Sequence, residues 1–477
     1  MNELQTVKQE IKPYPEKCYL PFILYPPGLY RNPMAGEKFL EENIDMDQDG
    51  DDFVLYIGIP FCRTKCKSCP YFISLLHSKN ADMEDKFVDA LIKDLTKWSK
   101  YRRWKTGTIR SIFIGGGTGS ILRTDNLKRI VNIVFSLFKV SDDYEFTLEG
   151  NTGDYDEEKI NYVVNSGINR ISFGIQSFQP EMLKIIGSPH TVENSKKVIK
   201  SFRDKGFKNI HLDLMFNMPG HTLDIWKKDL EELKNLGISH FTIYLYRIHD
   251  NSTQEKLIQK GKINAPINPE TPMVKAMYRE AKVIAESMGF KMYMIDHFCV
   301  PGYENKYNLW NWKIYVETLA VGPGSYSYID GFRLGTEADV EKYIEYCSSD
   351  KLLISSISDK LSERVQRERY IIFTLLYYEL EFKLYHDKFK TSFLEDFEDE
   401  VERLLNKKLV YLTDDKMLLT QLGIEWHTNV ILEFFNEKFW NDEKSVREPN
   451  WSLNGVMAEL GTKSRNFYLG EKNQTFY

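Results

Sequence analysis

The sequence lacks several features that would assign the protein to a broad class. No apolar run is long enough to span a bilayer, and polar residues interrupt the start of the chain, where a secretory signal would be apolar. Six cysteines are not a disulfide framework in a chain of 477 residues. An excess of basic residues is also missing, because the formal net charge is −6 and the pI is near 6.0. These absences predict a cytoplasmic, soluble protein with no membrane span and no nucleic-acid partner.

What is present fits a globular chain of more than one domain. Hydrophobic residues make up 42% and charged residues 28%, an ordinary balance for a protein with a large core. A length of 477 residues favours two or three domains. The patterns predict a loop-rich extension at 1–50, a strand–helix domain at 51–330, a helical module at 331–436 and a tail without a clear period at 437–477.

Strands and helices alternate through the second of these segments. Short apolar runs at 54–57, 111–114, 144–148, 170–173, 209–216 and 241–246 predict strands. Helical spacing of apolar residues predicts helices at 83–101, 125–138, 156–165, 191–205, 222–236 and 272–288. Repeated strand–helix units imply a parallel sheet, so we predict an α/β fold with a partial (β/α)6 TIM-like barrel. Functional residues of such barrels lie where the strands end.

The segment after the barrel has a different pattern. Helices are predicted at 362–378, 392–405 and 425–436, and two short strands at 409–411 and 417–419 form a hairpin. Helices with a two-stranded wing predict a winged-helix-like module. Its acidic balance argues against DNA binding.

Three cysteines with C-x3-C-x2-C spacing are the most informative feature of the chain. Cys62, Cys66 and Cys69 follow the first predicted strand. Three such thiolates can hold three irons of a cubane iron–sulfur cluster and leave the fourth iron open to a small chelating ligand. A zinc knuckle with a fourth ligand such as His77 is the alternative, although zinc sites usually pair two C-x2-C motifs and no second pair exists here.

A glycine run follows the second predicted strand, at Gly115-Gly-Gly-Thr-Gly-Ser120. Backbone without side chains allows a ligand to approach closely. Taken alone the run is a weak signal, because three glycines also serve a tight turn or a phosphate nest.

A series of motifs in a fixed order carries a family resemblance. The cysteine segment and the glycine run are followed by the segments at 173–178, 212–220, 296–298, 301–309 and 321–325. Together they closely resemble the radical S-adenosylmethionine enzymes related to oxygen-independent coproporphyrinogen III oxidase. The resemblance covers roughly residues 50–435, including the helical module.

The resemblance implies a cofactor set and its partners. Cys62, Cys66 and Cys69 would ligate a 4Fe-4S cluster, and S-adenosylmethionine would chelate the open iron. An electron, delivered by a donor such as flavodoxin or ferredoxin, would cleave the sulfonium to a 5′-deoxyadenosyl radical that reacts with a small-molecule substrate. The cofactor supplies the chemistry, while the barrel directs the radical. No catalytic residue beyond the cofactor contacts is assigned.

The resemblance also implies contacts to two S-adenosylmethionine molecules. Those to the first match Tyr56, Gly116 and Glu149, and those to the second match Gly117, Thr118, Gln176 and Asp213. Each of three has an alternative interpretation. Tyr56 could be an aromatic core residue, Glu149 could form a stabilising salt bridge, and Asp213 could cap a neighbouring loop instead of binding a ribose diol.

Four departures from the family pattern argue against coproporphyrinogen decarboxylation. Gly58 replaces a histidine, Ser68 an aromatic residue and Tyr71 a further cysteine. Ser188 stands where an arginine contact to the second cofactor is expected, so the second site would lack that contact.

The residues kept and lost favour a methyltransferase. Loss of oxidase residues with retention of Gln176 and Asp213 suggests an enzyme that methylates an sp2 carbon of a conjugated small molecule, such as a quinone or haem. One alternative is coproporphyrinogen III oxidase or an anaerobic haem-degrading enzyme. The oxidase has a similar extension before its cysteine segment and a segment like that at 296–298. Another is a haem chaperone, which the segment at 301–309 resembles.

Overall fold

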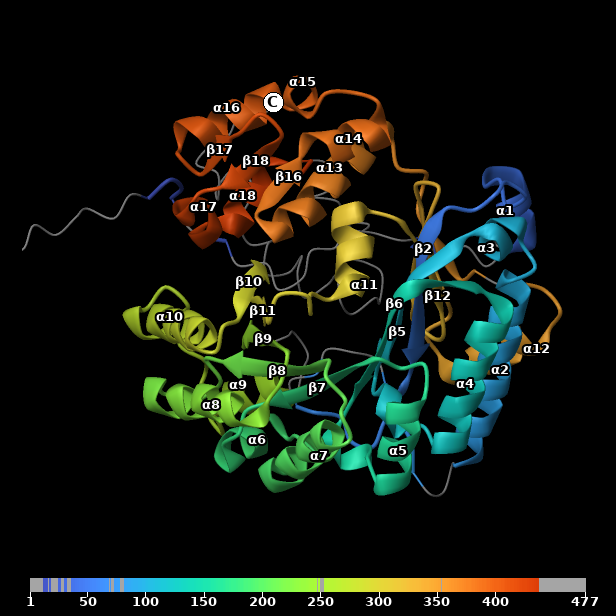
Figure 1. The fold of residues 1–477 in the computed structure, drawn as a ribbon, viewed down its shortest axis with the longest axis horizontal. Coiled ribbons are helices and arrows are strands. Elements are labelled where there is room, and N and C mark those ends of the chain that lie inside the picture. Colours follow the sequence, from blue (N-terminus) through green and yellow to red (C-terminus); the bar gives the residue numbers. More distant parts are fainter. Residues whose placement is uncertain are drawn as a thin grey trace, which may run out of the picture. The chain divides into compact units, whose positions relative to one another are not determined.

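The computed structural model describes residues 12–15, 17–18, 25–26, 30–31, 36–67, 69, 73–77, 81–246, 248, 253–352 and 354–436. Among these, residues 30–363 form the larger of two compact units, and residues 12–26 with 364–436 form the smaller. Figure 1 shows the elements of both units. Ser68, Tyr71 and the tail at 437–477 lie outside the described residues. The domain boundaries at 50, 330 and 436 stay a proposal.

Seven parallel strands form the centre of the larger unit, in the spatial order β12-β2-β5-β6-β7-β8-β9. They are β2 (Asp52–Ile59), β5 (Thr108–Gly116), β6 (Lys139–Gly150), β7 (Arg170–Gln176), β8 (Ile210–Phe216), β9 (His240–Leu245) and β12 (Glu317–Val321). Six of them are the predicted strands. The partial barrel expected from the sequence is therefore confirmed.

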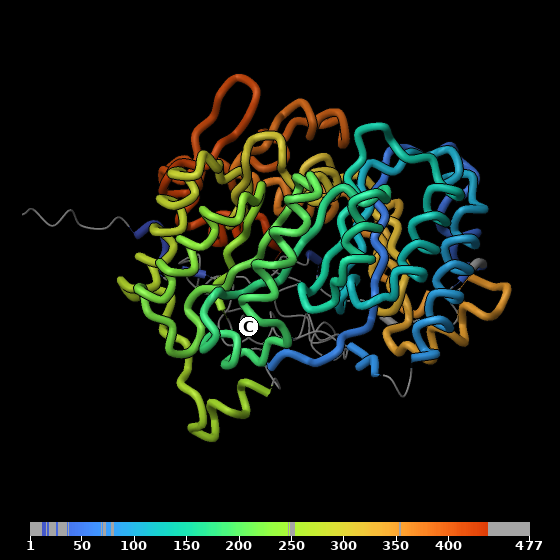
Figure 2. Tube along the Cα trace, turned by 60° about the horizontal axis from the view of Figure 1, so that its bottom comes forward, coloured from blue at the N-terminus to red at the C-terminus, as the bar shows by residue number. Residues whose placement is uncertain are grey.

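Helices cover the outer face of these strands, as the turned view in Figure 2 shows. The connecting helices are α2 (Asp82–Trp98), α4 (Thr124–Leu137), α5 (Glu157–Asn165), α7 (Val192–Asp204), α8 (Leu223–Leu236) and α10 (Pro272–Ser287). Shorter helices are α1 (Glu37–Asn43), α3 (Arg102–Thr106), α6 (Pro180–Ile186), α9 (Thr253–Gln259), α11 (Lys306–Asn308) and α12 (Val340–Ser348). In Figure 2 the colour changes steadily from one side of the sheet to the other, because most parallel neighbours follow one another in sequence.

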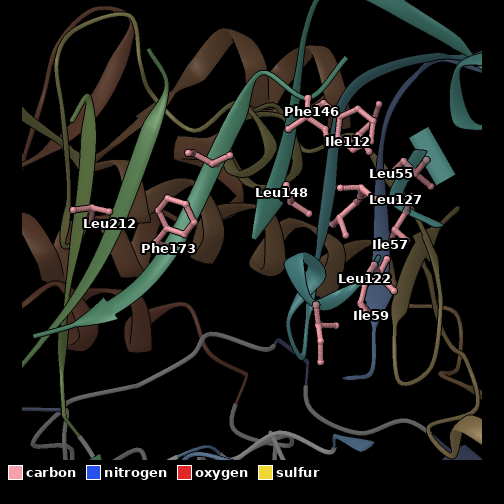
Figure 3. Packing of buried hydrophobic residues seen from close by; sticks show 14 of the residues in the cluster. Leu55, Ile57, Ile59, Ile112, Leu122, Leu127, Phe146, Leu148, Phe173 and Leu212 are labelled. Carbon is pink, nitrogen blue, oxygen red and sulfur yellow. The ribbon is translucent and has the colours of Figure 1, made fainter. Parts of the chain in front are cut away.

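Alternation along the strands separates the core from the barrel interior. On β2, Leu55, Ile57 and Ile59 are fully buried in the core under the helices. Tyr56, between them, points to the opposite face, since successive strand residues alternate. Figure 3 shows these three residues with core side chains of β5 to β8. Consequently the polar residues at alternate positions of the same strands face the inside of the barrel.

Antiparallel strands extend the sheet at both edges. Beyond β12 lie β13 (Tyr326–Ile329), β14 (Phe332–Gly335), β15 (Ser356–Ile357) and β1 (Tyr30–Arg31), and beyond β9 lie β11 (His297–Cys299) and β10 (Lys291–Met294). None of these edge strands was predicted from the sequence. Asp330 and Gly331 both have positive φ, 45° and 78°, between β13 and β14, the backbone of a two-residue hairpin turn that an Asp-Gly pair favours.

The smaller unit contains the predicted C-terminal helices and hairpin, whereas residues 331–363 of the predicted module belong to the larger unit. Its elements are α13 (Glu363–Thr374), α14 (Phe382–Phe389), α15 (Phe393–Asp396), α16 (Glu398–Asn406), α17 (Gln421–Glu425), α18 (His427–Glu433) and strands β16 (Glu379–Glu381), β17 (Val410–Leu412) and β18 (Lys416–Leu419). The hairpin of β17 and β18 is present, and β16 adds a third strand. In the part of the chain that the structure describes, no helix has the length and apolar character to cross a membrane.

Candidate functional site

The carboxyl ends of the parallel strands bring the predicted site residues to one end of the barrel. In register, Ile59 of β2 pairs with Gly116 of β5, and Gln176 of β7 pairs with Leu214 of β8. The cysteine loop continues directly from β2 through β3 (Phe61–Cys62), which pairs with β4 (Ser74–Leu75). Strand ends thus place the loop beside the glycine run.

The three cysteines of the loop are free thiols of intermediate burial. Burial, together with the charges of Cys69 and Cys66 and only partly offset by a hydrogen bond with Thr118, raises the pKa of Cys62 to about 12. Burial likewise raises the pKa of Cys66 to about 11. The three sulfurs therefore lie near enough to influence one another, and binding to a metal would be needed to keep them as thiolates.

The arrangement of these thiols fits a cluster better than a zinc ion. Among the described residues, no three His, Cys, Asp or Glu side chains converge so as to hold one metal ion, and this holds for His77 as well. A zinc site needs its ligands about 2.3 Å from a single ion, whereas a cubane distributes three thiolates over three irons. Three neighbouring thiols of one loop could each bind a different iron of a cubane.

Anchors at two points hold the cysteine loop. The Arg63 Nε donates to Asp154 Oδ1 at 2.5 Å, and Asp154 also accepts from the Ser120 hydroxyl at 3.0 Å. On the other side, the Lys67 backbone N–H donates to the Ile186 carbonyl at 2.9 Å. The loop is thereby attached to the turn after β6 and to the end of α6.

The glycine run is packed too tightly for side chains. A Cβ on Gly117 would lie 2.6 Å from the Phe61 carbonyl oxygen and 2.9 Å from that of Ile59. Gly116 has φ of 106°, which disfavours any other residue. The glycines therefore permit close packing against β2 and β3, and they also leave bare backbone at the strand end.

Thr118 and Tyr56 lie beside other candidate residues. The Thr118 hydroxyl is 3.1 Å from the Cys62 sulfur. Tyr56 stacks on Phe113 with ring centroids 6.0 Å apart, which supports its aromatic packing role. Its hydroxyl also lies 3.5 Å from the position of a Cβ on Gly116.

Glu149 has an electrostatic environment unlike that of a surface carboxylate. Burial and then repulsion from Asp213 raise its pKa to about 7, although a hydrogen bond from the Gly116 backbone and the charge of Arg170 lower it. Within the described part of the chain no cation lies within ion-pair distance of Glu149, so the salt-bridge interpretation gains no support. A carboxyl group poised near neutral pH can accept or release a proton at this site.

Gln176 and Asp213 each present an oxygen that receives no hydrogen bond from the part of the chain that the structure describes. The Oε1 of Gln176 is buried and has no partner among the described residues, and the backbone there has φ of 66°. Asp213 uses Oδ1 to accept from His211 Nε2 at 2.7 Å and from the Thr242 hydroxyl. Burial favours its protonated form, but His211 and Thr242 together lower the pKa of Asp213 overall. A ligand with hydrogen-bond donors fits these two oxygens.

Two departures from the family pattern have structural causes. A Cβ on Gly58 would meet the Ser325 hydroxyl at 2.3 Å, so a histidine there would require the Ser325 side chain to move. Ser188 bonds through its hydroxyl to His190 Nδ1 at 2.9 Å. It therefore supports the end of α6 instead of reaching a ligand as an arginine would.

Several polar residues inside the barrel were missed by sequence reasoning. They occupy alternate positions on their strands, and this period was the available signal: Arg170 and Ser172 on β7, His211 on β8, and His240 and Thr242 on β9. A separate cavity of about 530 Å³ lies at the opposite ends of the strands, where Glu145, Asn209 and Lys306 line it. It is not adjacent to the cysteine loop.

Comparisons with known proteins agree with this geometry. Residues 56–233 match the Radical SAM superfamily. The haem chaperone HemW of Lactococcus lactis is 28% identical over 80% of this chain and 96% of its own length, and the anaerobilin synthase of Escherichia coli O157:H7 is 25% identical over 67% and 71%. The solved structure of coproporphyrinogen III oxidase HemN from Escherichia coli superimposes with a TM-score of 0.71 at 18% identity, over 85% of this chain and 94% of that one.

The family implies a 4Fe-4S cluster and S-adenosylmethionine, and the donor set described above fits both. The fold, the cysteine loop and the relatives lead to one assignment. The chain belongs to the radical S-adenosylmethionine superfamily and, within it, to the family of oxygen-independent coproporphyrinogen oxidase HemN and the haem chaperone HemW.

Proposed function

We propose that the chain is a haem-binding radical S-adenosylmethionine protein with a role like that of the haem chaperones it resembles. The observation that carries this proposal is the extent of the similarity, which spans 96% of the Lactococcus chaperone and not only the cysteine segment. The tight packing at Gly58 and the bond made by Ser188 further separate this site from the oxidase pattern. This proposal replaces the methyltransferase as the first candidate.

The residues of the site have distinct roles in this proposal. Cys62, Cys66 and Cys69 would hold the 4Fe-4S cluster, while the glycine run and Glu149 would contact S-adenosylmethionine. When bound, this pair supplies a carbon radical upon reduction, and an acidic electron carrier such as flavodoxin or ferredoxin would supply the electron. The protein orients the ligand, and the buried side chains of the barrel wall restrict the access of water to it.

Haem titration tests the proposal directly. Reconstituted protein should show a saturable Soret shift with haem, and should pass intact haem to an apo-haem protein added afterwards. The variant with Cys62, Cys66 and Cys69 changed to alanine should lose the cluster absorbance, which separates haem binding from cluster binding. Absence of any saturable Soret shift in the reconstituted protein would refute the chaperone role.

Methyl transfer to a conjugated substrate is a second candidate. The unpartnered Oε1 of Gln176 and the free oxygen of Asp213 favour it, because they offer a place for a second S-adenosylmethionine. Anaerobic incubation with haem, a reductant and S-adenosylmethionine distinguishes the two functions. A chaperone leaves haem intact, whereas a methyltransferase or a haem-degrading enzyme bleaches the Soret band or shifts the haem mass and forms S-adenosylhomocysteine.

A further inference from the structure

A series of hydrogen-bonded side chains crosses the inside of the barrel. His211 Nε2 lies 2.7 Å from Asp213 Oδ1, and His211 Nδ1 lies 2.5 Å from His240 Nδ1. His240 Nε2 is 2.8 Å from the Tyr293 hydroxyl, and that oxygen accepts from the Asn305 backbone N–H at 3.1 Å. The series therefore joins β8, β9 and β10 to the residue that precedes α11.

Only one arrangement of protons satisfies every contact in this series. Burial lowers the pKa of both His211 and His240, so both rings are neutral near pH 7 and each carries one N–H. An ionised Asp213 only accepts, so His211 carries its proton on Nε2 and accepts at Nδ1. His240 must then donate from Nδ1 and accept at Nε2. The Tyr293 hydroxyl donates to that nitrogen, and all bonds point toward Asp213.

The carboxylate at the end of the series keeps one oxygen for a ligand. Thr242 and His211 both donate to Oδ1, whereas Oδ2 receives no hydrogen bond from the described residues. The Asp213 side chain is 15% exposed at the strand end. Glu149 and His297 also face it, and Glu149 repels its charge. If the series served only to pair buried polar groups with one another, that role would explain the hydrogen bonds to Oδ1 but not why Oδ2 is left without one.

We propose that His211, His240 and Tyr293 are positioning residues that hold Asp213 ionised, with Oδ2 directed to hydroxyl or ammonium donors of a bound ligand. This inference rests on the proposed function, in which the strand ends bind S-adenosylmethionine. The histidines are inward positions of β8 and β9, and Tyr293 restricts the tautomer of His240 from a third strand. Together they act on the ligand only through Asp213.

The tautomers can be measured without any ligand. In protein labelled with 15N-histidine, we expect His211 to carry its proton on Nε2 and His240 on Nδ1, both rings neutral at pH 7. The nine histidine signals are assigned by the loss of one signal in His211→Gln and one in His240→Gln. An Nε2-protonated His240, or a charged ring in either residue at pH 7, would overturn the proposal.

Ligand affinity tests the effect on Asp213. With S-adenosylhomocysteine as the probe, His211→Phe should weaken binding roughly tenfold because it removes a hydrogen bond to a charged group. His211→Gln retains an N–H near the Nε2 position and should stay close to the wild type, while Tyr293→Phe should weaken binding roughly threefold through two intervening rings. His190→Gln is the control, since His190 is a buried histidine outside the series.

Two results contradict the inference without affecting the proposed function. If Asp213→Asn binds S-adenosylhomocysteine as the wild type does, Asp213 is no ligand contact and the inference fails. If His211→Phe binds S-adenosylhomocysteine with the affinity of the wild type, His211 does not position Asp213. If the variants change S-adenosylhomocysteine affinity as expected but the protein shows no haem binding in the titration, only the haem role is refuted.

Discussion

Arg63 and Asp154 form an ion pair of 2.5 Å that connects the cysteine loop to the turn after β6. The two partners differ in burial, because the Asp154 side chain is 3% exposed and that of Arg63 is 58% exposed. Asp154 is also held by Ser120. The aspartate is thus fixed by the barrel, and the ion pair holds Arg63, the residue next to Cys62, in place.

Replacement of Arg63 by methionine should loosen the loop without unfolding the protein. The Arg63 side chain is mostly exposed, and the buried Asp154 keeps its hydrogen bond from Ser120, so the free energy of unfolding should fall by only about 1 kcal/mol. Cluster retention should fall, measured as faster loss of absorbance when a chelator is added to the reconstituted protein. Lys86→Met is the matched control, because Lys86 forms an exposed ion pair with Asp82 on α2. Equal decay in both variants would contradict an anchoring role for Arg63.

A methyl group at Gly117 should be poorly tolerated. The added Cβ would lie 2.6 Å from the Phe61 carbonyl oxygen, a backbone atom that cannot rotate away. We expect Gly117→Ala to lower the free energy of unfolding by about 1–3 kcal/mol and to weaken S-adenosylhomocysteine binding. Gly153→Ala is the control, since its Cβ would meet only the Asn151 side chain at 3.1 Å. Similar losses in the two variants would show that position 117 is not special.

Glu149 should make stability depend on pH between the unfolded and folded pKa values. Its pKa rises from 4.5 to about 7 on folding, chiefly through burial, so the folded state holds a proton that the unfolded state releases in this window. Stability from this group therefore falls as pH rises from 4.5 to 7. Glu149→Gln removes the cost, and the variant should exceed the wild type by up to about 3 kcal/mol above pH 7.

Urea denaturation at pH 5 and pH 8 checks this expectation for Glu149. The difference between variant and wild type should grow from the lower to the higher pH. Asp94 and Asp229, whose pKa values burial raises to about 6, contribute equally to both proteins and cancel. A difference that is constant or shrinks with pH would contradict the raised pKa.

The sequence predicted the barrel well because its helices and strands repeat strong local patterns. Edge strands were harder, since β13 and β14 are only four residues each and β13 pairs with β12, a strand that the sequence patterns did not predict. The Asp330-Gly331 turn was nevertheless a readable signal. Patterns over a few residues determine individual helices and strands, whereas the pairing of edge strands depends on contacts between segments that are distant in the sequence.

The site was predictable where a motif names the residue and not where the fold alone brings residues together. Cys62 could be selected from the cysteine spacing, and Gly117 from the family resemblance of the glycine run. His211 and His240 could not, because they are separated by 29 positions and meet only when β8 and β9 pair in register. The raised pKa of Glu149 likewise could not be predicted, because it depends on burial in the folded barrel and on the charge of Asp213, which lies on a different strand.

Glu433 should dominate the stability of the smaller unit. Its side chain is fully buried, and it accepts from Tyr14 at 2.9 Å, from Arg403 at 3.0 Å and from Lys407 at 2.8 Å. Burial alone would raise the pKa of Glu433, but Lys407 and Arg403 lower it overall. The stabilisation is therefore present above the unfolded pKa and is lost as pH falls.

The Glu433→Gln variant should lose about 2 kcal/mol at pH 7, because two cations lose their buried partner, and little near pH 4. Hydrogen exchange of the amides of α18 reports this unit separately from the barrel, and exchange there should accelerate in the variant at pH 7. Asp387→Asn is the control within the same unit, since Asp387 pairs with Lys383 on the exposed face of α14. Unchanged exchange in Glu433→Gln would show that Arg403 and Lys407 find other partners, and that the N-terminal Tyr14 does not depend on this carboxylate.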